Sequence, residues 1–319
     1  AFVTMNGDVG NDYLWNSGAN VTINGDADND TVYSYGSYNS SIDGGAGNDY
    51  ILQGWHSDDS IFGDDSTITG GDGDDTIDNY GGQRVSISGG AGNDRIYNEN
   101  VTQWNSATQQ YETVSSPDNT TISGGAGNDY IDNYGSKVSI NGGNGSDTVW
   151  NYGASVSING NAGNDEIYNN GSNVSMLGGA GDDEITLSSY SRNNFVRYAD
   201  GDGNDTVWGI TPNDTLNLLA DVSLVSSLRS GDDLIVNVST GSVRLVGAWE
   251  KPPHITIGES GTSSGKGDNG DNNSSSGRGD RGGNGGGRSS GGKSTSEGRN
   301  SDASGGKSAT GSAGSQTST

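Results

Sequence analysis

The fold is decided by residues 44–52, which read Gly44-Gly45-Ala46-Gly47-Asn48-Asp49-Tyr50-Ile51-Leu52. Variants of this segment begin at positions 7, 25, 44, 70, 89, 124, 142, 160, 178 and 200. Four of the nine intervals are 18 residues, two are 19, and the others are 22, 26 and 35. Self-similarity at a short, regular period indicates a stacked repeat architecture. Eighteen residues are two nonapeptides, which make one complete turn of a two-sided roll.

A second kind of half-turn lies between these copies, for example residues 133–140, Asn-Tyr-Gly-Ser-Lys-Val-Ser-Ile, and it lacks the Gly-Gly-x-Gly-x-Asp pattern. Each strand is expected to point one apolar side chain inward while its neighbours face water. In the glycine-rich copies this is the eighth residue: Leu14, Val32, Ile51, Ile77, Ile96, Ile131, Val149, Ile167, Ile185 and Val207. The opposite strands supply pairs such as Val138 and Ile140. We therefore predict an all-β fold, a right-handed parallel β-roll (β-solenoid) of about 18 residues per turn.

The composition agrees with a thin core, because the 319 residues include 57 glycines and only 28% are hydrophobic. The net charge of −26 is uneven, since residues 1–258 hold 8 Lys/Arg and 35 Asp/Glu. Such an excess argues against nucleic acid or anionic membrane as partners and favours metal ions. There is no cysteine, and His56 and His254 are too few for a zinc site. Calcium is the counterion that oxygen ligands favour.

The glycine-rich turns have the residues that such ions need. Adjacent glycines allow positive φ and bring carbonyl oxygens inward, and the sixth-position aspartate offers a carboxylate to an ion shared with the next turn. The predicted carboxylate ligands are Asp12, Asp30, Asp49, Asp75, Asp94, Asp129, Asp147, Asp165, Asp183 and Asp205, with carbonyls of residues such as Gly44, Ala46, Gly124, Ala126, Gly142, Asn144, Gly178 and Ala180. Ten uninterrupted turns enclose at most nine calcium ions, all along one edge. The alternative, that these clusters are only turns between strands, does not account for ten copies in phase.

These residues resemble the RTX (hemolysin-type calcium-binding) nonapeptide repeat, whose pattern is matched closely at residues 44–52, 89–97, 124–132 and 178–186. The resemblance covers roughly residues 5–258. It implies type I secretion, an extracellular or cell-surface location, and folding on contact with external calcium. Asp8, Asp26 and Asn161 replace the second glycine and Asp28 the fourth, so weaker ion binding is expected in the first two turns.

The chain divides into three expected regions. Residues 1–209 form the roll, 210–258 a C-terminal β capping region, and 259–319 a Gly/Ser-rich disordered tail or linker. A hairpin insertion is expected at about 99–119 on the metal-free edge. Residues 54–61 form a degenerate nonapeptide. The sequence leaves open whether this segment, through Asp59, or the 98–123 insertion binds calcium.

Aromatic side chains are the candidate partner contacts: Trp15, Tyr33, Trp104, Tyr111, Trp150, Tyr168 and Trp208. An exposed aromatic stripe suits sugars or a neighbouring protein, and the competing interpretation is that the rings stack between turns for stability. A row of serine and threonine on the opposite face raises ice binding as a remote alternative.

No catalytic motif such as His-Glu-x-x-His is present, and no apolar run is long enough to span a membrane. We expect a non-enzymatic, extracellular calcium-binding module with a structural or adhesive role, whose partners are Ca²⁺ and possible copies of itself or glycans. The alternative is the C-terminal secretion and folding module of an exported enzyme whose catalytic domain lies outside this chain. The reading frame around this segment distinguishes the two.

Overall fold

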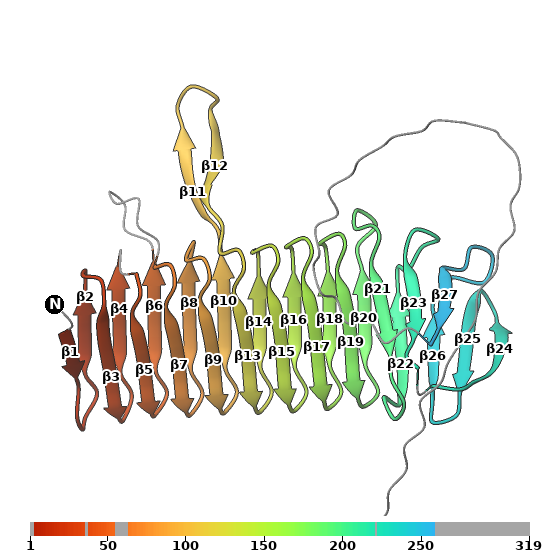
Figure 1. Cartoon of the computed structure of the whole chain (residues 1–319), viewed down its shortest axis with the longest axis horizontal. Helices are drawn as coiled ribbons and strands as arrows, with labels where there is room; N and C mark the ends of the chain where they lie inside the picture. The colour runs from red at the N-terminus through yellow and green to blue at the C-terminus, as the bar shows by residue number, and fades with distance from the viewer. Residues whose placement is uncertain (1–2, 36–37, 55–62, 221, 259–319) are drawn as a thin grey trace, which may run out of the picture. The chain divides into compact units, whose positions relative to one another are not determined.

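The computed structural model describes residues 3–35, 38–54, 63–220 and 222–258. The expectations for Asp59 and for the tail at 259–319 lie outside the described residues. Across the described ranges the chain is all-β without a helix, so no helix there is long and apolar enough to cross a membrane. The strands form a parallel β-solenoid, as predicted (Figure 1). The handedness stays a prediction.

Two sheets face each other and alternate along the chain. Sheet A has 12 strands, in the order β1 (Val3–Asn6), β3 (Val21–Ala27), β5 (Ser41–Ala46), β7 (Thr67–Asp72), β9 (Ser86–Ala91), β13 (Thr121–Ala126), β15 (Ser139–Asn144), β17 (Ser157–Ala162), β19 (Ser175–Ala180), β21 (Phe195–Tyr198), β23 (Thr215–Leu218) and β27 (His254–Ile257). Sheet B has 13 strands, in the order β2 (Tyr13–Asn16), β4 (Thr31–Tyr35), β6 (Tyr50–Gly54), β8 (Thr76–Tyr80), β10 (Arg95–Glu99), β14 (Tyr130–Asn133), β16 (Thr148–Asn151), β18 (Glu166–Asn169), β20 (Glu184–Leu187), β22 (Asn204–Trp208), β26 (Ser242–Leu245), β25 (Asp233–Val238) and β24 (Leu224–Ser230).

The register places equivalent residues of successive turns side by side. Ile131 pairs with Val149 in sheet B, and Ile122 pairs with Ile140 in sheet A. Because strand side chains alternate between faces, the aliphatic columns of both sheets point into the narrow interior. Every predicted eighth-position aliphatic is buried, and so are Val138 and Ile140. The core is therefore a continuous spine of branched aliphatic residues.

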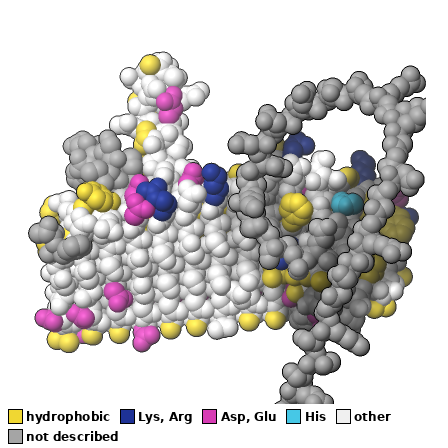
Figure 2. Space-filling model, in the orientation of Figure 1, with side chains coloured by type: hydrophobic (Ala, Val, Ile, Leu, Met, Phe, Trp, Pro, Cys, Tyr) yellow, Lys and Arg dark blue, Asp and Glu magenta, His cyan; other side chains and the backbone are white. Residues whose placement is uncertain are grey.

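The outward face of sheet A carries small polar residues, with Thr121, Ser139 and Ser157 in register on adjacent strands. The broad face turned to the viewer in Figure 2 is accordingly almost free of charged and hydrophobic side chains. Charged and hydrophobic groups gather along its two edges.

An antiparallel hairpin of β11 (Val101–Asn105) and β12 (Gln110–Ser115) lies where the sequence predicts one. It rises from the edge opposite the glycine-rich turns (Figure 1). The β capping region expected at 210–258 stays a prediction, and its strands continue both sheets. β23 and β27 continue sheet A in parallel register, so the roll extends beyond residue 209. Only sheet B ends differently, because β26, β25 and β24 pair antiparallel.

Candidate metal-binding edge

The glycine-rich turns all connect a strand of sheet A to the following strand of sheet B, so they lie along one edge. Each ends in its sixth-position aspartate, which lies immediately before the sheet B strand or, for Asp205, within it. Stacking of the turns brings all ten predicted aspartates into one column. Asp12 at the first turn is partly buried, and the other nine are buried, with Asp75 0% and Asp147 1% exposed.

One oxygen of each carboxylate is used to join neighbouring turns. The backbone N–H of Asp129 donates to Oδ1 of Asp147 at 2.8 Å, and that of Asp147 donates to Oδ1 of Asp165 at 2.8 Å. The same bond recurs from Asp12 to Asp205 across nine turn junctions. Each aspartate except the first therefore satisfies a backbone donor of the turn before it.

The second oxygen of these carboxylates is unsatisfied. Among the described residues, Oδ2 is buried and has no hydrogen-bond partner in Asp12, Asp30, Asp49, Asp75, Asp94, Asp129, Asp147, Asp165 and Asp183. A buried acceptor without a donor costs free energy, and an ionised one costs more. Nine such atoms in a single column call for a compensating cation or for protons.

The pKa values of several of these aspartates reflect the cost of burying a carboxylate whose second oxygen has no partner. Burial, reinforced by the charges of Asp94 and Asp49, raises the pKa of Asp75 to about 7, although the backbone bond from Asp49 opposes the rise. Burial likewise raises the pKa of Asp147 to about 7 and of Asp183 to about 7. At Asp205, burial and the charge of Asp183 raise the pKa to about 8. These raised pKa values favour protonation of the four carboxylates in the metal-free protein.

The first glycine of each turn borders the unsatisfied oxygen. A Cβ placed on Gly142 would collide with Asp147 Oδ2 and would lie 2.8 Å from the carbonyl oxygen of Gly160 in the next turn. Gly124 has the same two neighbours one turn earlier, with the Gly142 carbonyl oxygen 2.5 Å from its added Cβ. The environment of each Oδ2 is thus lined by oxygen atoms and kept open by glycine.

The predicted carbonyl ligands divide into two groups. The first-glycine carbonyls, such as Gly142 O, face the first glycine of the preceding turn. The third-position carbonyls already accept a backbone bond, as Asn144 does from Gly127 at 2.8 Å and Ala180 from Gly163 at 2.9 Å. A carbonyl oxygen has two lone pairs, so these atoms keep one for a further ligand.

Within the described ranges no three acidic or histidine side chains converge on one point. A metal ion here would therefore take carboxylates from adjacent turns together with main-chain carbonyls, which is the donor set the sequence predicts. The donors are all oxygen, and several are anionic. This environment fits a hard divalent cation such as calcium.

The substitutions in the repeat occupy strained backbone positions. Gly143 and its equivalents have positive φ, 128° at Gly143. Asn161 takes the same position at 78° and Asp26 at 78°, while Asp28 in the fourth position has φ 75°. Asparagine and aspartate tolerate this region better than other non-glycine residues. The expected weakness of the first two turns stays a prediction.

A second ladder, at the fifth position of each turn, is a feature that sequence reasoning missed. The backbone N–H of Ser146 donates to Asn128 Oδ1 at 2.7 Å, and that of Asp182 donates to Asn164 Oδ1 at 3.0 Å. These bonds run from a later turn to an earlier one, opposite to those of the aspartate column. The recurrence of Asn, Asp or Ser at this position was the available signal.

The opposite edge holds a third ladder, also missed. Asn133, Asn151 and Asn169 follow the eighth-position aliphatic by two residues, point inward and are buried. Asn133 Nδ2 donates to Asn151 Oδ1 and Asn151 Nδ2 to Asn169 Oδ1, each at 2.8 Å. β14, β16 and β18 thus each have a second inward-pointing residue besides the aliphatic one, and this second residue is an asparagine. The amides of Asn133 and Asn151 satisfy the next turn and the turn backbone, whereas Asn79 Oδ1, earlier in the same ladder, is buried and without a partner among the described residues.

The aromatic contact candidates fall into two groups. Trp15 is 53% exposed, Trp208 41%, and on the hairpin Trp104 52% and Tyr111 72%. Trp150 and Tyr168 are only partly exposed and stack at 4.2 Å between ring centroids, with planes 14° apart. The inner faces of these two rings are therefore closed to a ligand. Tyr33 also packs against neighbouring rings, with Tyr13 at 5.3 Å and Tyr50 at 5.9 Å. Stacking between turns accounts for this part of the stripe.

No family model and no curated protein matches this chain. One solved structure with similarity is an extracellular lipase, LipA, from Serratia marcescens, at 19% identity and a TM-score of 0.29. The alignment covers 69% of this chain and 38% of the lipase chain. A likeness at this TM-score says nothing about what this chain binds or does.

Proposed function

We propose that this chain is a calcium-binding β-roll module of a secreted protein and that it folds when it meets calcium outside the cell. The observation that carries the proposal is the column of nine buried carboxylate oxygens that have no hydrogen-bond partner in the described part of the chain. The Gly-Gly-x-Gly-x-Asp repeat and its RTX resemblance point to the same ion.

The residues that would hold calcium are the sixth-position aspartates of neighbouring turns, with the first-glycine and third-position carbonyls between them. When bound, calcium supplies the positive charge that the buried carboxylates lack. The chain itself supplies the scaffold, because Oδ1 of each aspartate after Asp12 is already held by a backbone N–H of the preceding turn. Only Oδ2 remains for the ion.

Folding and ion binding are linked by electrostatics. Residues 1–258 carry 35 acidic against 8 basic side chains, and stacking places the aspartates one strand spacing apart. Neutralisation of this column favours the stacked state over the unfolded chain. Extracellular calcium modules operate at about 10⁻⁴ to 10⁻³ M, which suits a chain that stays unfolded inside the cell and folds after export.

A structural role follows from the continuity of the stack, since three side-chain ladders and two backbone ladders link successive turns. The exposed residues Trp104 and Tyr111 on the hairpin support a further contact role, adhesive in kind. Rigid spacing is the primary task that we assign to the module.

The test is circular dichroism and calorimetry on the full chain, with calcium titrated into the metal-free protein. We expect β-structure and thermal stability to rise with calcium, with several ions bound per chain and nine as the upper limit. Unchanged β-structure after chelation, together with no measurable binding, would refute the proposal.

A matched pair of variants separates the ion site from general acidity. Asp183→Asn alters a buried sixth-position carboxylate, whereas Asp182→Asn alters the exposed acidic side chain next to it. Both retain the side-chain oxygen that accepts a backbone bond. Asp183→Asn is expected to lower the number or affinity of the bound ions, and Asp182→Asn to leave both nearly unchanged.

A further inference from the structure

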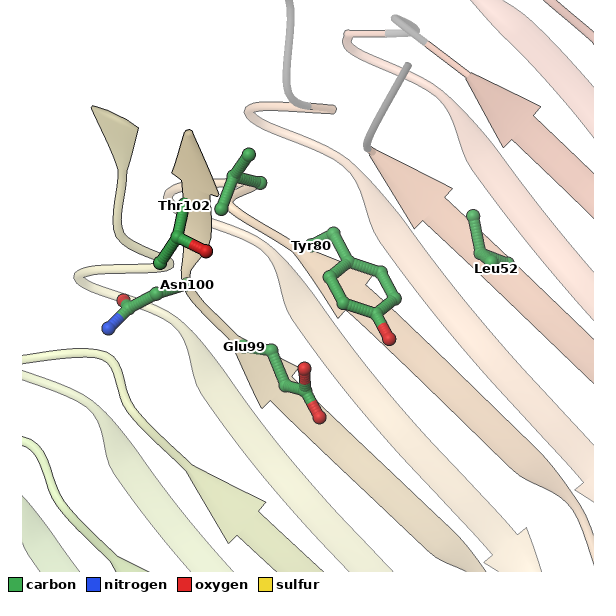
Figure 3. Close-up of a pocket in the computed structure, with 6 residues that line it drawn as sticks. Leu52, Tyr80, Glu99, Asn100 and Thr102 are labelled. Atoms are coloured by element: carbon green, nitrogen blue, oxygen red, sulfur yellow. The ribbon is translucent and has the colours of Figure 1, made fainter. Parts of the chain in front are cut away.

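A pocket of about 310 Å³ opens on the outward face of sheet B, at the base of the β11–β12 hairpin and away from the aspartate column. It is lined by Leu52, Tyr80, Glu99, Asn100, Val101 and Thr102 (Figure 3). Tyr80 and Glu99 are register partners on β8 and β10, and Leu52 comes from the neighbouring strand β6. The hairpin base closes one side of the pocket with Asn100 and the two residues that follow it.

The polar atoms of the pocket are mainly unsatisfied acceptors. Asn100 Oδ1 is buried and has no hydrogen-bond partner among the described residues. The Glu99 carboxylate forms none of the side-chain hydrogen bonds or ion pairs found in the described ranges. A ligand that satisfies these atoms must donate hydrogen bonds.

The surroundings of the pocket are acidic. Tyr97 pairs with both Asp78 and Asp132, so these two carboxylates flank the strand that carries Glu99. Burial, together with the charges of Asp78 and Asp132, raises the pKa of Glu99. Asp132 Oδ1 is also buried without a partner. The described arginine ion pairs lie elsewhere, at Arg84, Arg229 and Arg244, so no described ion pair offsets these three charges.

The size and apolar walls of the pocket exclude a simple metal site. Its volume is far larger than one ion requires, and no three acidic groups in the described part of the chain converge on a point. Leu52 and Val101 provide aliphatic surface, and the Tyr80 ring provides an aromatic wall (Figure 3). Aromatic walls next to carboxylates suit organic cations, which gain both charge attraction and cation–π contact.

We propose that this pocket binds the guanidinium or ammonium group of an arginine side chain, a lysine side chain or a free amine. The cationic head donates to the Glu99 carboxylate, the Tyr80 ring lies against it, and Leu52 and Val101 contact the alkyl stem. A neutral sugar lacks the charge that the three carboxylates attract. The proposal is independent of calcium binding at the opposite edge.

The experiment is titration calorimetry on the full chain in constant, saturating calcium. The probes are N-acetyl-arginine amide, its neutral isostere N-acetyl-citrulline amide, N-acetyl-lysine amide and spermidine. We expect saturable binding of the charged probes and binding of the citrulline compound at least about tenfold weaker, because its neutral urea lacks the positive charge that the carboxylates attract. A comparison of spermidine with the blocked amino acids distinguishes a free amine from a protein side chain as the natural source.

Glu99→Gln and Glu184→Gln are a matched pair, because both remove one negative charge from the outward face of sheet B and only Glu99 lines the pocket. Glu99→Gln is expected to weaken binding of the arginine probe about tenfold or more, and Glu184→Gln less than about twofold. Tyr80→Leu, which keeps an apolar side chain, is expected to weaken it several-fold. Circular dichroism checks that each variant is folded.

Three results would overturn the proposal. One is the absence of binding by any charged probe, and another is equal binding of the arginine and citrulline compounds. The third is equal weakening by Glu99→Gln and Glu184→Gln, which would assign the effect to the general acidity of the chain. Displacement of the probe by additional calcium, beyond the effect of ionic strength, would assign the pocket to a metal ion instead.

Discussion

The backbone N–H of Asp129 donates a 2.8 Å hydrogen bond to Oδ1 of Asp147 in the next turn, whereas Oδ2 of Asp147 is buried with no partner. One carboxylate therefore has two separable tasks. Its first oxygen joins neighbouring turns whenever the roll is folded. Its second oxygen stabilises the stack only when a proton or a cation is present.

Asp147→Asn separates these tasks. Its amide oxygen keeps the bond from Asp129, and its NH₂ group lies near the Gly160 carbonyl oxygen, which borders the same space beside Gly142. We expect this variant to be more stable than the parent in metal-free buffer at pH 8 and less stable in millimolar calcium, by about 1–3 kcal/mol in each direction. Thermal melts with and without calcium measure both changes.

Asp147→Ala provides the comparison, since it also leaves the N–H of Asp129 without its acceptor. It is expected to be less stable than Asp147→Asn under both conditions. Destabilisation by Asp147→Asn in metal-free buffer would contradict the view that this carboxylate is an uncompensated charge.

The stability of the metal-free protein should fall as the pH rises. Burial raises the pKa of Asp94 to about 6 and that of Asp205 to about 8. A group with a raised folded-state pKa contributes stability that is complete below its unfolded pKa, near 4, and is lost as the pH rises through the folded value. Thermal melts in metal-free buffer between about pH 5 and 8 should therefore show a falling midpoint.

Calcium should reverse this dependence, because ions and protons compete for the same oxygens and the apparent calcium affinity then rises over the same pH interval. Asp147→Asn should flatten the metal-free slope more than Asp182→Asn, which alters an exposed group. A metal-free midpoint that stays level or increases toward pH 8 would argue against protonation of the column.

The buried asparagine ladder should stabilise the roll independently of calcium. Asn151→Ala removes the acceptor of Asn133 Nδ2, the donor to Asn169 Oδ1 and both bonds to Gly153. Loss of these buried bonds is expected to cost about 2–4 kcal/mol. Denaturant unfolding should show the same loss at every calcium concentration at which the chain is folded. Asn170→Ala, at an exposed neighbouring position, serves as the control and should change stability by less than about 0.5 kcal/mol.

Two glycines with positive φ should respond differently to alanine. At Gly143, φ is 128° and an added Cβ would overlap the Gly125 carbonyl of the preceding turn. At Gly201, φ is 90° and an added Cβ would meet nothing within 4 Å. Gly201→Ala should cost only about 1–2 kcal/mol of backbone strain. Gly143→Ala should cost more than that and should also weaken calcium binding, because the turns must separate. Equal losses in unfolding experiments would show that contact between turns is not the limiting factor.

Sequence periodicity alone determined the β-solenoid, the repeat length, the aliphatic spine and which aspartates stack in one column, because each repeat requires glycine, aspartate and aliphatic residues at fixed offsets. Local spacing also located the hairpin around Trp104. Tertiary structure decided what depends on the stacking of turns. Four features arise between residues that are distant in sequence. They are the different roles of Oδ1 and Oδ2 of Asp147, the inward asparagines, the stacked rings of Trp150 and Tyr168, and the pocket at Glu99. Residues from different turns meet only when the register is set, so no single repeat contains the information.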